Sequence, residues 1–553
     1  MKNQLNYFTT KKSIVISFLI IILVASFIRL FQLSTVSIYG DELTIVYDAY
    51  SILYTGRDQL GNFLPITFEM GAGRPGGYIY GSLPFVALFG PDEYGVRMLS
   101  VLSGLGIIIA SYFLVKGLQL SRGVGLLLGI MLAFVPWAVN LSRGGFESHF
   151  ALFLAITGFT CLLYVKQKPW ILLVTAFTIG ISIHTYPTFK LTLPLMLLLF
   201  AWFASAKDWL SDSNIRKYLF AGIAILSFFV VVSIIQTVGA GADSRFLSIN
   251  IFSDEVQTRF ITEDVVIERN LSETPAALDP LFHNRYVAYP MLFLRNYFES
   301  LSIRYLFLTG DYNPRHNMTQ SGGFFVIELL TILIGLGSLL FKQKKVLLLL
   351  IGWILIAPLS TALLTEVHTL RNSLLFMPLS ILSAVGLYTL FTMKNKKYMM
   401  LIFFIALLWF IQFLFVYEKL YYVSPQLFSR HWAYPAKQLS EQIEREKNNF
   451  DYVIVRDNID NIEYAYPTYA VIDPREVISA EKNRVTLNNK QFKKFGNVYI
   501  GGFADSEAEA FLAALPGRVL YFSNVDQMKT LTNYSIVTGK DNLVSYTVKE
   551  IHH

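Results

Sequence analysis

The sequence lacks the cysteines that disulfide, redox or thiolate-metal chemistry would need. Its 553 residues include a single cysteine, Cys161, which lies inside an apolar run. One cysteine can form no disulfide within the chain, and it has no cysteine partner with which to hold a metal ion. Redox chemistry is therefore not expected of this protein.

Charged residues are also scarce. They make up 15% of the chain, against 54% hydrophobic residues, and the mean hydropathy is +0.47. These values lie far from those of average soluble domains and are typical of an integral membrane protein. The formal net charge of +7 does not indicate nucleic-acid binding, because the basic residues occur in short clusters between apolar runs, as topology signals do.

The first apolar run, Ser13 to Leu33, is long enough to cross a bilayer, and Lys11 and Lys12 before it favour a cytoplasmic start. The run is too long for the apolar part of a signal peptide. Moreover, Arg29-Leu30-Phe31-Gln32 stands where a small-residue cleavage site would be expected. We interpret the run as a retained membrane anchor with a cytoplasmic N-terminus.

Counting apolar spans of roughly 17 to 25 residues predicts about eleven transmembrane helices. Their approximate extents are 13–33, 95–116, 122–139, 148–165, 169–186, 188–206, 218–238, 323–341, 345–364, 372–391 and 398–417. The loops assigned to the cytoplasmic side are short and basic, with Lys116, Arg122, Lys166, Lys168, Lys207, Arg216, Lys217, Lys342, Lys344, Lys345, Lys394, Lys396 and Lys397. An odd number of crossings that begins inside ends outside, so residues 418–553 are predicted to be extracytoplasmic.

The predicted organisation is a mainly α-helical, polytopic membrane core over residues 1–423 and a small extracytoplasmic α/β domain over residues 424–553. The core has two large outer loops, 34–94 and 239–322. The first ends in an apolar segment, Tyr78 to Phe89, which is too short to span the bilayer and is interpreted as an interfacial helix. The second is rich in aromatic residues, which favours an ordered structure.

The tail changes to a pattern of alternating helices and strands. We expect helices at 436–447 and 506–515, strands at 451–455, 498–500 and 519–522, and a hairpin of 534–537 with 543–548. Nothing in this domain marks a catalytic site. No internal repeat or low-complexity tract is evident in the chain.

Two adjacent carboxylates, Asp41 and Glu42, follow the first predicted span by a few residues. The sequence contains no HExxH motif, and the glycine-rich stretch 71–77 lacks the preceding strand and the lysine of a phosphate-binding loop. What remains is acidic residues in the outer loops, with basic residues and histidines in other outer turns. These are Arg143, Glu147, His149, His184, Lys190, Arg245, His283, Arg315, His316, Glu366, His368 and Arg371.

In these motifs the chain resembles a known family, the polyprenyl-phosphate-sugar-dependent membrane glycosyltransferases of the GT-C superfamily. The resemblance is to glycosyltransferase family 39, which includes relatives of the protein O-mannosyltransferases and the lipid A aminoarabinose transferases. It covers most of residues 15–420. The matching stretches are Arg29-Leu30, Tyr39-Gly40-Asp41-Glu42, 49–58, 142–147, Leu281-Phe282-His283-Asn284-Arg285, 310–316, and Pro358 through His368 to Arg371.

The resemblance implies a sugar carried on a polyprenyl phosphate and transferred, with inversion, to a hydroxyl acceptor at the outer face. Outside the cell there is no nucleotide-sugar pool, so a lipid-borne donor is physically sensible. The acceptor hydroxyl needs a base, and the resemblance assigns that role to Asp41. Glu42 points in a different direction from its neighbour and is expected to orient a loop or to bind substrate. Glu147 completes the predicted catalytic set.

The expected substrate-binding residues are Arg57, Tyr78, Arg143, His149, Tyr186, Lys190, Arg245, Arg315, His316, His368 and Arg371. Each also has a structural interpretation. Glu147 can pair with Arg143 four positions earlier, and the basic residues can anchor lipid headgroups. No histidine pair has a convincing metal spacing, so no metal ligand is predicted. A divalent metal held by Asp41 and Glu147 with the donor phosphate is an alternative that the sequence leaves open.

Other functional classes compete with this prediction. A secondary transporter or flippase of a lipid-linked or small solute would also have many spans, but it should show paired halves and ionisable groups near the midplane. A polymerase or ligase of surface glycans and a non-catalytic membrane scaffold are further alternatives. The sequence identifies neither the sugar nor the acceptor, which can be a lipid, a surface glycan or a protein.

Overall fold

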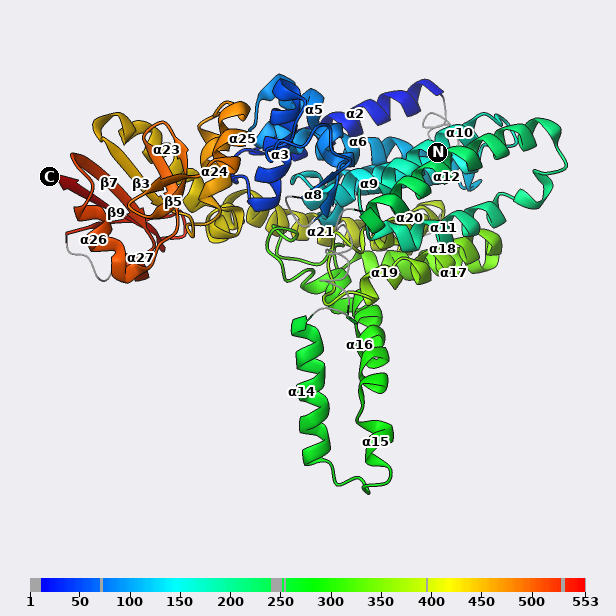
Figure 1. Cartoon of the computed structure of the whole chain (residues 1–553). Coiled ribbons are helices and arrows are strands. Elements are labelled where there is room, and N and C mark those ends of the chain that lie inside the picture. The colour runs from blue at the N-terminus through cyan, green and yellow to red at the C-terminus, as the bar shows by residue number, and fades with distance from the viewer. Residues whose placement is uncertain are drawn as a thin grey trace. The chain divides into compact units, whose positions relative to one another are not determined.

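The computed structural model describes residues 11–69, 73–239, 251–252, 255–393, 396–528 and 533–552. The chain divides into two compact units (Figure 1). Unit 1 comprises Met1–Phe31, Ala72–Gly77 and Ser100–Tyr417, and unit 2 comprises Gln32–Gly71, Tyr78–Leu99 and Glu418–His553.

Unit 1 is an assembly of apolar helices. They are α2 (Lys11–Leu30), most of α6 (Glu93–Gly117), α7 (Arg122–Phe134), α8 (Pro136–Ser142), α9 (Glu147–Leu162), α10 (Ile171–Ile183), α11 (Phe189–Phe203), α12 (Ser213–Gly239), α17 (Glu328–Lys342), α18 (Lys344–Ile356), α19 (Leu359–Ala362), α20 (Ser373–Thr392) and α21 (Lys396–Glu418). This confirms the predicted mainly α-helical membrane core.

Among the described residues, six helices are long and apolar enough to cross a membrane, or seven if α7 and α8, bent by 58°, form one span. Other predicted crossings fall on shorter helices such as α9, α10 and α11, of 16, 13 and 15 residues. At 1.5 Å per residue these are about 20 to 24 Å long, less than the roughly 30 Å of the hydrocarbon layer. The count of eleven crossings therefore stays a prediction.

The core of unit 1 includes a close contact between α17 and α20. A side chain at Gly335 would collide with the backbone carbonyl of Leu382, and one at Gly386 would collide with that of Thr331. The missing side chains let the two backbones approach closely, as small residues do between membrane helices. The hydroxyls of Thr331 and Ser383 form a hydrogen bond across the same interface. This contact fixes the two helices, α17 and α20, that follow the loops containing residues 310–316 and 368.

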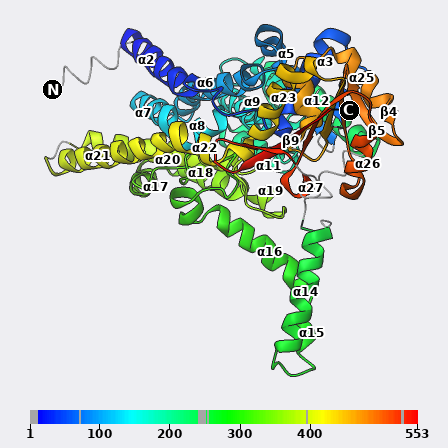
Figure 2. The ribbon, with the colours of Figure 1, turned by 90° about the vertical axis from the view of Figure 1, so that its left-hand side faces the viewer.

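The segment predicted as the second outer loop, residues 239–322, contains a helical hairpin. It consists of α14 (Glu255–Leu271), α15 (Asp279–Phe282) and α16 (Arg285–Ser300), followed by a π-helical turn at Arg304–Leu308. In Figures 1 and 2, α14 and α16 run side by side and project away from the other helices of unit 1. Asn284 caps α16 by accepting a hydrogen bond from the backbone N–H of Val287. The loop is thus ordered where the structure describes it, as its aromatic content predicts.

Unit 2 contains a seven-stranded sheet with the order β4-β5-β6-β3-β7-β9-β8. The strands are β3 (Tyr452–Arg456), β4 (Val485–Leu487), β5 (Lys490–Phe495), β6 (Val498–Gly501), β7 (Arg518–Ser523), β8 (Ser535–Thr538) and β9 (Val544–His552). β3 is parallel to β6 and to β7, with Val453 opposite Val498 and Tyr452 opposite Val519. The remaining pairs are antiparallel.

Helices α23 (Tyr434–Glu446), α24 (Ile462–Tyr469), α25 (Pro474–Lys482), α26 (Ala508–Ala513) and α27 (Val525–Met528) accompany this sheet. One core cluster lies between α26 and the sheet and includes Ile454, Phe511, Leu512 and Tyr521. The predicted small α/β domain is confirmed, including β3, β6, β7, the closing hairpin and the first helix. The prediction did not include α24, α25 or the β4–β5 hairpin.

Unit 2 also contains the first outer loop, with α3 (Gly40–Thr55), β1 (Thr67–Phe68) and most of α5 (Gly77–Phe89). The Tyr47 hydroxyl donates to the carbonyl of Ile472 at 2.9 Å, and Lys437 forms an ion pair with Glu93 at 2.7 Å. The compact units therefore group these outer-loop residues with the tail, whereas the sequence division at residue 424 assigns them to the core. The helix expected from Tyr78 to Phe89 is present as α5.

Candidate functional site

Asp41 and Glu42 lie in the first turn of α3, but their side chains are placed very differently. Asp41 is exposed, whereas Glu42 has no exposed surface. Tyr39, the residue before the helix, has an extended backbone and makes no side-chain cap. Carboxylates in a first helical turn are favoured by the partial positive charge of the helix N-terminus. Of the two neighbours, only Asp41 is accessible from outside the protein.

Glu42 is bound by Arg97, near the start of α6. The guanidinium donates to both carboxylate oxygens, through Nε at 2.9 Å and through Nη2 at 2.7 Å. The same guanidinium also donates to the backbone carbonyls of Leu33, Val36 and Ser37. It lies over the ring of Trp432, 5.1 Å from the ring centroid. Arg97 thus joins the segment that leads into α3, the first turn of that helix and the tail.

The tail of the chain contacts the residues just before Asp41. The backbone N–H of Ile38 donates to the Tyr469 hydroxyl oxygen at 2.9 Å. A Cβ at Gly40 would lie 3.3 Å from Nδ2 of Asn461, so the helix start and α24 are in close contact. Burial raises the pKa of Tyr469 well above its usual value, and this side chain therefore stays neutral. The position of Asp41 depends on the α/β domain as well as on the outer loop.

Glu147 begins α9 in unit 1 and forms an ion pair with Arg74 of β2 (Arg74–Pro75). The two charged atoms are 2.8 Å apart, and the side chains are 11% and 1% exposed. Three residues after Arg74, the backbone N–H of Gly77 donates to the carbonyl of His184, 3.3 Å away. These contacts bring together the glycine-rich stretch, the turn before α9 and the turn after α10. The sequence suggested a pair of Glu147 with Arg143, whereas the ion pair described here is with Arg74.

Arg143 and His149 contact the protein's own polar groups. Arg143 Nη1 donates to three carbonyls at the end of α2, those of Ile28, Arg29 and Phe31. His149 Nε2 lies 3.1 Å from the Ser142 hydroxyl, which is also bonded by the buried Arg29. A cation at a helix C-terminus is favourable, so these side chains stabilise the junction of α2 with α8 and α9.

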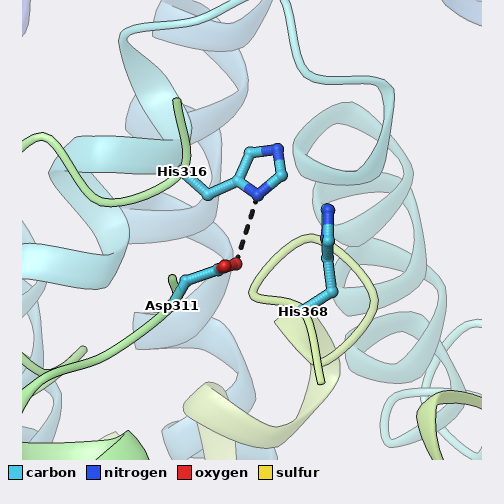
Figure 3. A group of neighbouring side chains, drawn as sticks. All are labelled: Asp311, His316 and His368. Atoms are coloured by element: carbon cyan, nitrogen blue, oxygen red, sulfur yellow. Dashed lines mark hydrogen bonds and ion pairs between the residues drawn. The ribbon is translucent and has the colours of Figure 1, made fainter. Parts of the chain in front are cut away.

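A further group of polar side chains lies on the loops between α16 and α20. One ligand-type atom from each of Asp311, His316 and His368 lies within 4.8 Å of the other two. His316 Nδ1 is 3.2 Å from Asp311 Oδ2, and the two imidazole rings are 4.0 Å apart (Figure 3). Burial raises the pKa of Asp311, but the hydrogen bond and the charges of the two histidines outweigh it and hold that pKa well below its ordinary value. The Phe146 ring packs edge-on against His316.

The other predicted substrate-binding residues are spread over several elements. Tyr78 is fully buried, and its hydroxyl donates to the carbonyl of Val96. Arg57 is exposed and donates to the carbonyl of Gly61. Tyr186 is buried, Lys190 is exposed, and Arg315 and Arg371 are partly exposed. Arg245 lies outside the described residues.

Sequence reasoning missed three features of these sites. It did not select Arg74 or Arg97, which bind the two glutamates, because their partners are distant in the chain. It found no metal spacing among the histidines, since His316 and His368 come from different loops. The motif 310–316, which includes Asp311 and His316, was the one signal that could have marked the triad, because it already carried part of the family resemblance.

Comparison with solved structures identifies the class of fold. ArnT from Cupriavidus metallidurans, in a crystal structure bound to undecaprenyl phosphate, is similar with a TM-score of 0.54 and 11% identity over 98% of each chain. An Archaeoglobus fulgidus oligosaccharyltransferase tethered to an acceptor peptide is similar with a TM-score of 0.51 and 13% identity, over 94% of this chain and 70% of that one. These similarities show a fold of the GT-C type.

The sequence comparison is more specific. The family model described as dolichyl-phosphate-mannose-protein mannosyltransferase matches residues 82–235. No curated protein matches the chain. The shared fold and the family match over residues 82–235 both agree with the resemblance to the GT-C superfamily that the motifs indicate.

Proposed function

We propose that this protein transfers a sugar from a polyprenyl-phosphate donor to a hydroxyl acceptor at the outer face of the membrane, with inversion at the anomeric carbon. The observation that carries the proposal is the contrast between two neighbouring carboxylates. Asp41 is exposed, while Glu42 is buried against Arg97. The full-length similarity to ArnT bound to undecaprenyl phosphate supports the choice of donor.

In this reaction Asp41 acts as the general base. As the acceptor oxygen attacks the anomeric carbon, its proton moves to the Asp41 carboxylate, and the bond from the anomeric carbon to the phosphate oxygen breaks. The electron pair of that bond leaves with the polyprenyl phosphate. One displacement from the opposite face inverts the configuration. A positioned base of this kind contributes roughly 10²- to 10⁴-fold to a rate.

The leaving phosphate needs cations more than it needs an acid. Its second pKa is about 6, so it departs as an anion at neutral pH, and fixed positive charges stabilise the negative charge that develops. We assign this role to basic residues of the predicted outer turns: Lys190, Arg245, Arg315 and Arg371. The exposed Lys190 and the partly exposed Arg315 and Arg371 are accessible to a ligand.

The remaining predicted site residues receive supporting roles. Glu42 holds the loop that leads into α3 through Arg97, and Arg143 and His149 stabilise the end of α2. Glu147 lies in the ion pair with Arg74, where its 11% exposure leaves an edge that can meet a substrate hydroxyl.

The test is Asp41→Asn in membranes supplied with a radiolabelled polyprenyl-phosphate sugar. The amide keeps the size of the side chain but cannot accept the acceptor proton, so transfer should fall about 10²- to 10⁴-fold. Glu69→Gln is the matched control, because Glu69 is another exposed carboxylate of the first outer loop, and it should transfer at the wild-type rate. The anomeric configuration of the product reports inversion.

Two outcomes would contradict the proposal. Undiminished transfer by Asp41→Asn would remove the base assignment. A change in solute uptake by inverted or right-side-out vesicles, with no sugar transfer by the wild-type chain, would favour a transporter. Comparing lipid-linked sugars extracted from cells with and without the gene identifies the donor, since the unused lipid-linked sugar should accumulate when the enzyme is lost.

A further inference from the structure

The side chains of Asp311, His316 and His368 form a cluster of atoms of the kinds that bind metal ions. The transfer reaction proposed above does not require this cluster. Two imidazoles and one carboxylate from two loops surround one small space (Figure 3). The carboxylate and the His316 ring are buried, and His368 is partly exposed. Such a group is either a hydrogen-bonded cluster or a set of metal ligands, and its dimensions distinguish the two.

The separations fit a shared ion. Zinc–nitrogen and zinc–oxygen bonds are about 2.0 to 2.2 Å long, so two ligand atoms on a tetrahedral ion lie roughly 3.3 Å apart. His316 Nδ1 and Asp311 Oδ2 are 3.2 Å apart, and all three ligand atoms lie within 4.8 Å of one another. Small side-chain rotations would bring the third atom to the same ion.

The carboxylate is held in place by the protein around it. Asp311 Oδ2 accepts a hydrogen bond from the backbone N–H of Thr369 at 2.6 Å, and Oδ1 accepts one from the N–H of Asn313 at 2.9 Å. Asn317 Nδ2 donates to the carbonyls of Thr309 and Asp311, which closes the loop. Metal-ligating carboxylates are typically oriented by such outer hydrogen bonds. The hydrogen bond from Thr369 also connects the two loops, because that residue follows His368.

The close histidine pair is consistent with metal binding. The ring centroids of His316 and His368 are 4.0 Å apart, so each ring can offer a nitrogen atom to the same ion. Imidazole ligands favour zinc and similar transition metals, whereas Mg²⁺ and Ca²⁺ prefer oxygen ligands.

We propose that Asp311, His316 and His368 bind one divalent transition-metal ion of the zinc type. The ion joins the loop that precedes α17 to the loop that precedes α20. Three protein ligands leave a fourth coordination position for water or for an oxygen atom of a bound anion. The site lies beside the turn before α9, since the Phe146 ring contacts His316.

Metal content tests this proposal directly. The full chain is purified in detergent with an affinity tag that contains no histidine, stripped with a chelator, incubated with Zn²⁺ and desalted. Bound zinc is then measured by mass spectrometry. We expect about one zinc per chain, and at least 10-fold weaker binding for Asp311→Asn, His316→Ala and His368→Ala, since even outer-shell changes cost 10- to 100-fold. Co²⁺ should give the visible absorption of a low-symmetry site in the wild-type chain only.

His283→Ala is the matched control. His283 lies in the same unit, with Nδ1 3.0 Å from Glu268 Oε2, but it belongs to no three-ligand group among the described residues. It should bind zinc as the wild-type chain does. Unfolding temperatures of the stripped proteins identify any variant that fails to fold, and His368→Asn provides a milder replacement at that position.

Two results would overturn the proposal. The first is less than stoichiometric zinc in the wild-type chain, and the second is equal zinc in the wild-type and triad variants. Either result would mean that the cluster is a hydrogen-bonded group only. These measurements do not depend on sugar transfer. The metal proposal can therefore fail while Asp41→Asn still abolishes transfer, and it can hold even if Asp41→Asn has no effect on transfer.

Discussion

Arg97 donates two hydrogen bonds to the carboxylate of Glu42, 2.9 and 2.7 Å long, and neither side chain is more than 1% exposed. A bidentate arginine–carboxylate pair is among the strongest charge-assisted contacts in proteins. It connects α3 to α6 and fixes the turn that presents Asp41. The two carboxylates that are adjacent in the sequence therefore differ in their surroundings: Glu42 is buried in an ion pair, and Asp41 is exposed.

The first prediction concerns that pair. Arg97→Ala and Glu42→Ala should each destabilise the protein by about 3–5 kcal/mol, because each leaves a buried charge without its partner. The double variant Glu42→Leu with Arg97→Met should recover much of this loss, since buried ion pairs can often be replaced by apolar side chains. Thermal unfolding in detergent measures all three proteins.

The control for this prediction is Lys166→Ala, because Lys166 forms an exposed ion pair with Asp208, with side chains 56% and 52% exposed. Exposed pairs contribute only about 0–1 kcal/mol. If either buried variant unfolds at the wild-type temperature, the pair does not hold the first outer loop.

The second prediction concerns the contact between the tail and the residues before Asp41. Tyr469→Phe removes the oxygen that accepts the N–H of Ile38, and an unsatisfied buried donor costs about 1–3 kcal/mol. We expect slower transfer with little change in KM for the donor, because Tyr469 acts through the position of Asp41. Tyr422→Phe is the control, since that tyrosine lies in the same unit and is 59% exposed. Equal rates for both variants would show that the tail does not position the base.

Much of the fold was predictable because it depends on local patterns. Apolar runs predict membrane helices from residue type alone, and alternating runs with Pro-Gly and Gly-Lys breaks predict β3, β7 and the β8–β9 hairpin. The strands that were not predicted show where local patterns are insufficient. β5 includes Lys490, Lys493 and Lys494, so it lacks an apolar alternation, and this strand forms because it pairs with β6.

The site was predictable only in part, and for a related reason. Asp41 could be selected by its place beside a membrane span and by its motif. The partners of the two glutamates could not be selected from the sequence. Arg97 lies 55 residues from Glu42, and Arg74 and Glu147 lie on different loops. Long-range pairing of charges depends on the tertiary structure, and no local pattern encodes it.

The third prediction concerns Glu147 and Arg74. If Glu147 serves only this ion pair, the exchanged variant Arg74→Glu with Glu147→Arg should recover a large part of the transfer that each single variant loses. If Glu147 also contacts substrate, as we propose, the exchanged variant should fold like the wild-type chain but stay at least 10-fold slower. Transfer assays and unfolding temperatures of the four proteins separate these outcomes. Full recovery of transfer would remove Glu147 from the catalytic set.

The last prediction concerns the side of the membrane on which the tail lies. Cys161 is the one cysteine of the chain, so Cys161→Ser provides a background in which single cysteines report topology. A cysteine at Glu509, which is exposed on α26, should react with a membrane-impermeant maleimide in intact cells. A cysteine at Lys344, which is exposed in a loop assigned to the cytoplasm, should react only after permeabilisation.

This labelling pattern is expected from the charge bias of the loops, since lysine and arginine are retained on the cytoplasmic side. Labelling of both positions in intact cells would place Lys344 outside and contradict the loop assignment. Labelling of neither would place the tail inside, where Asp41 of the same unit would also lie, because Ile38 and Gly40 before it contact Tyr469 and Asn461. The proposed reaction on an extracytoplasmic acceptor would then be wrong, even if Asp41→Asn abolished sugar transfer in broken membranes.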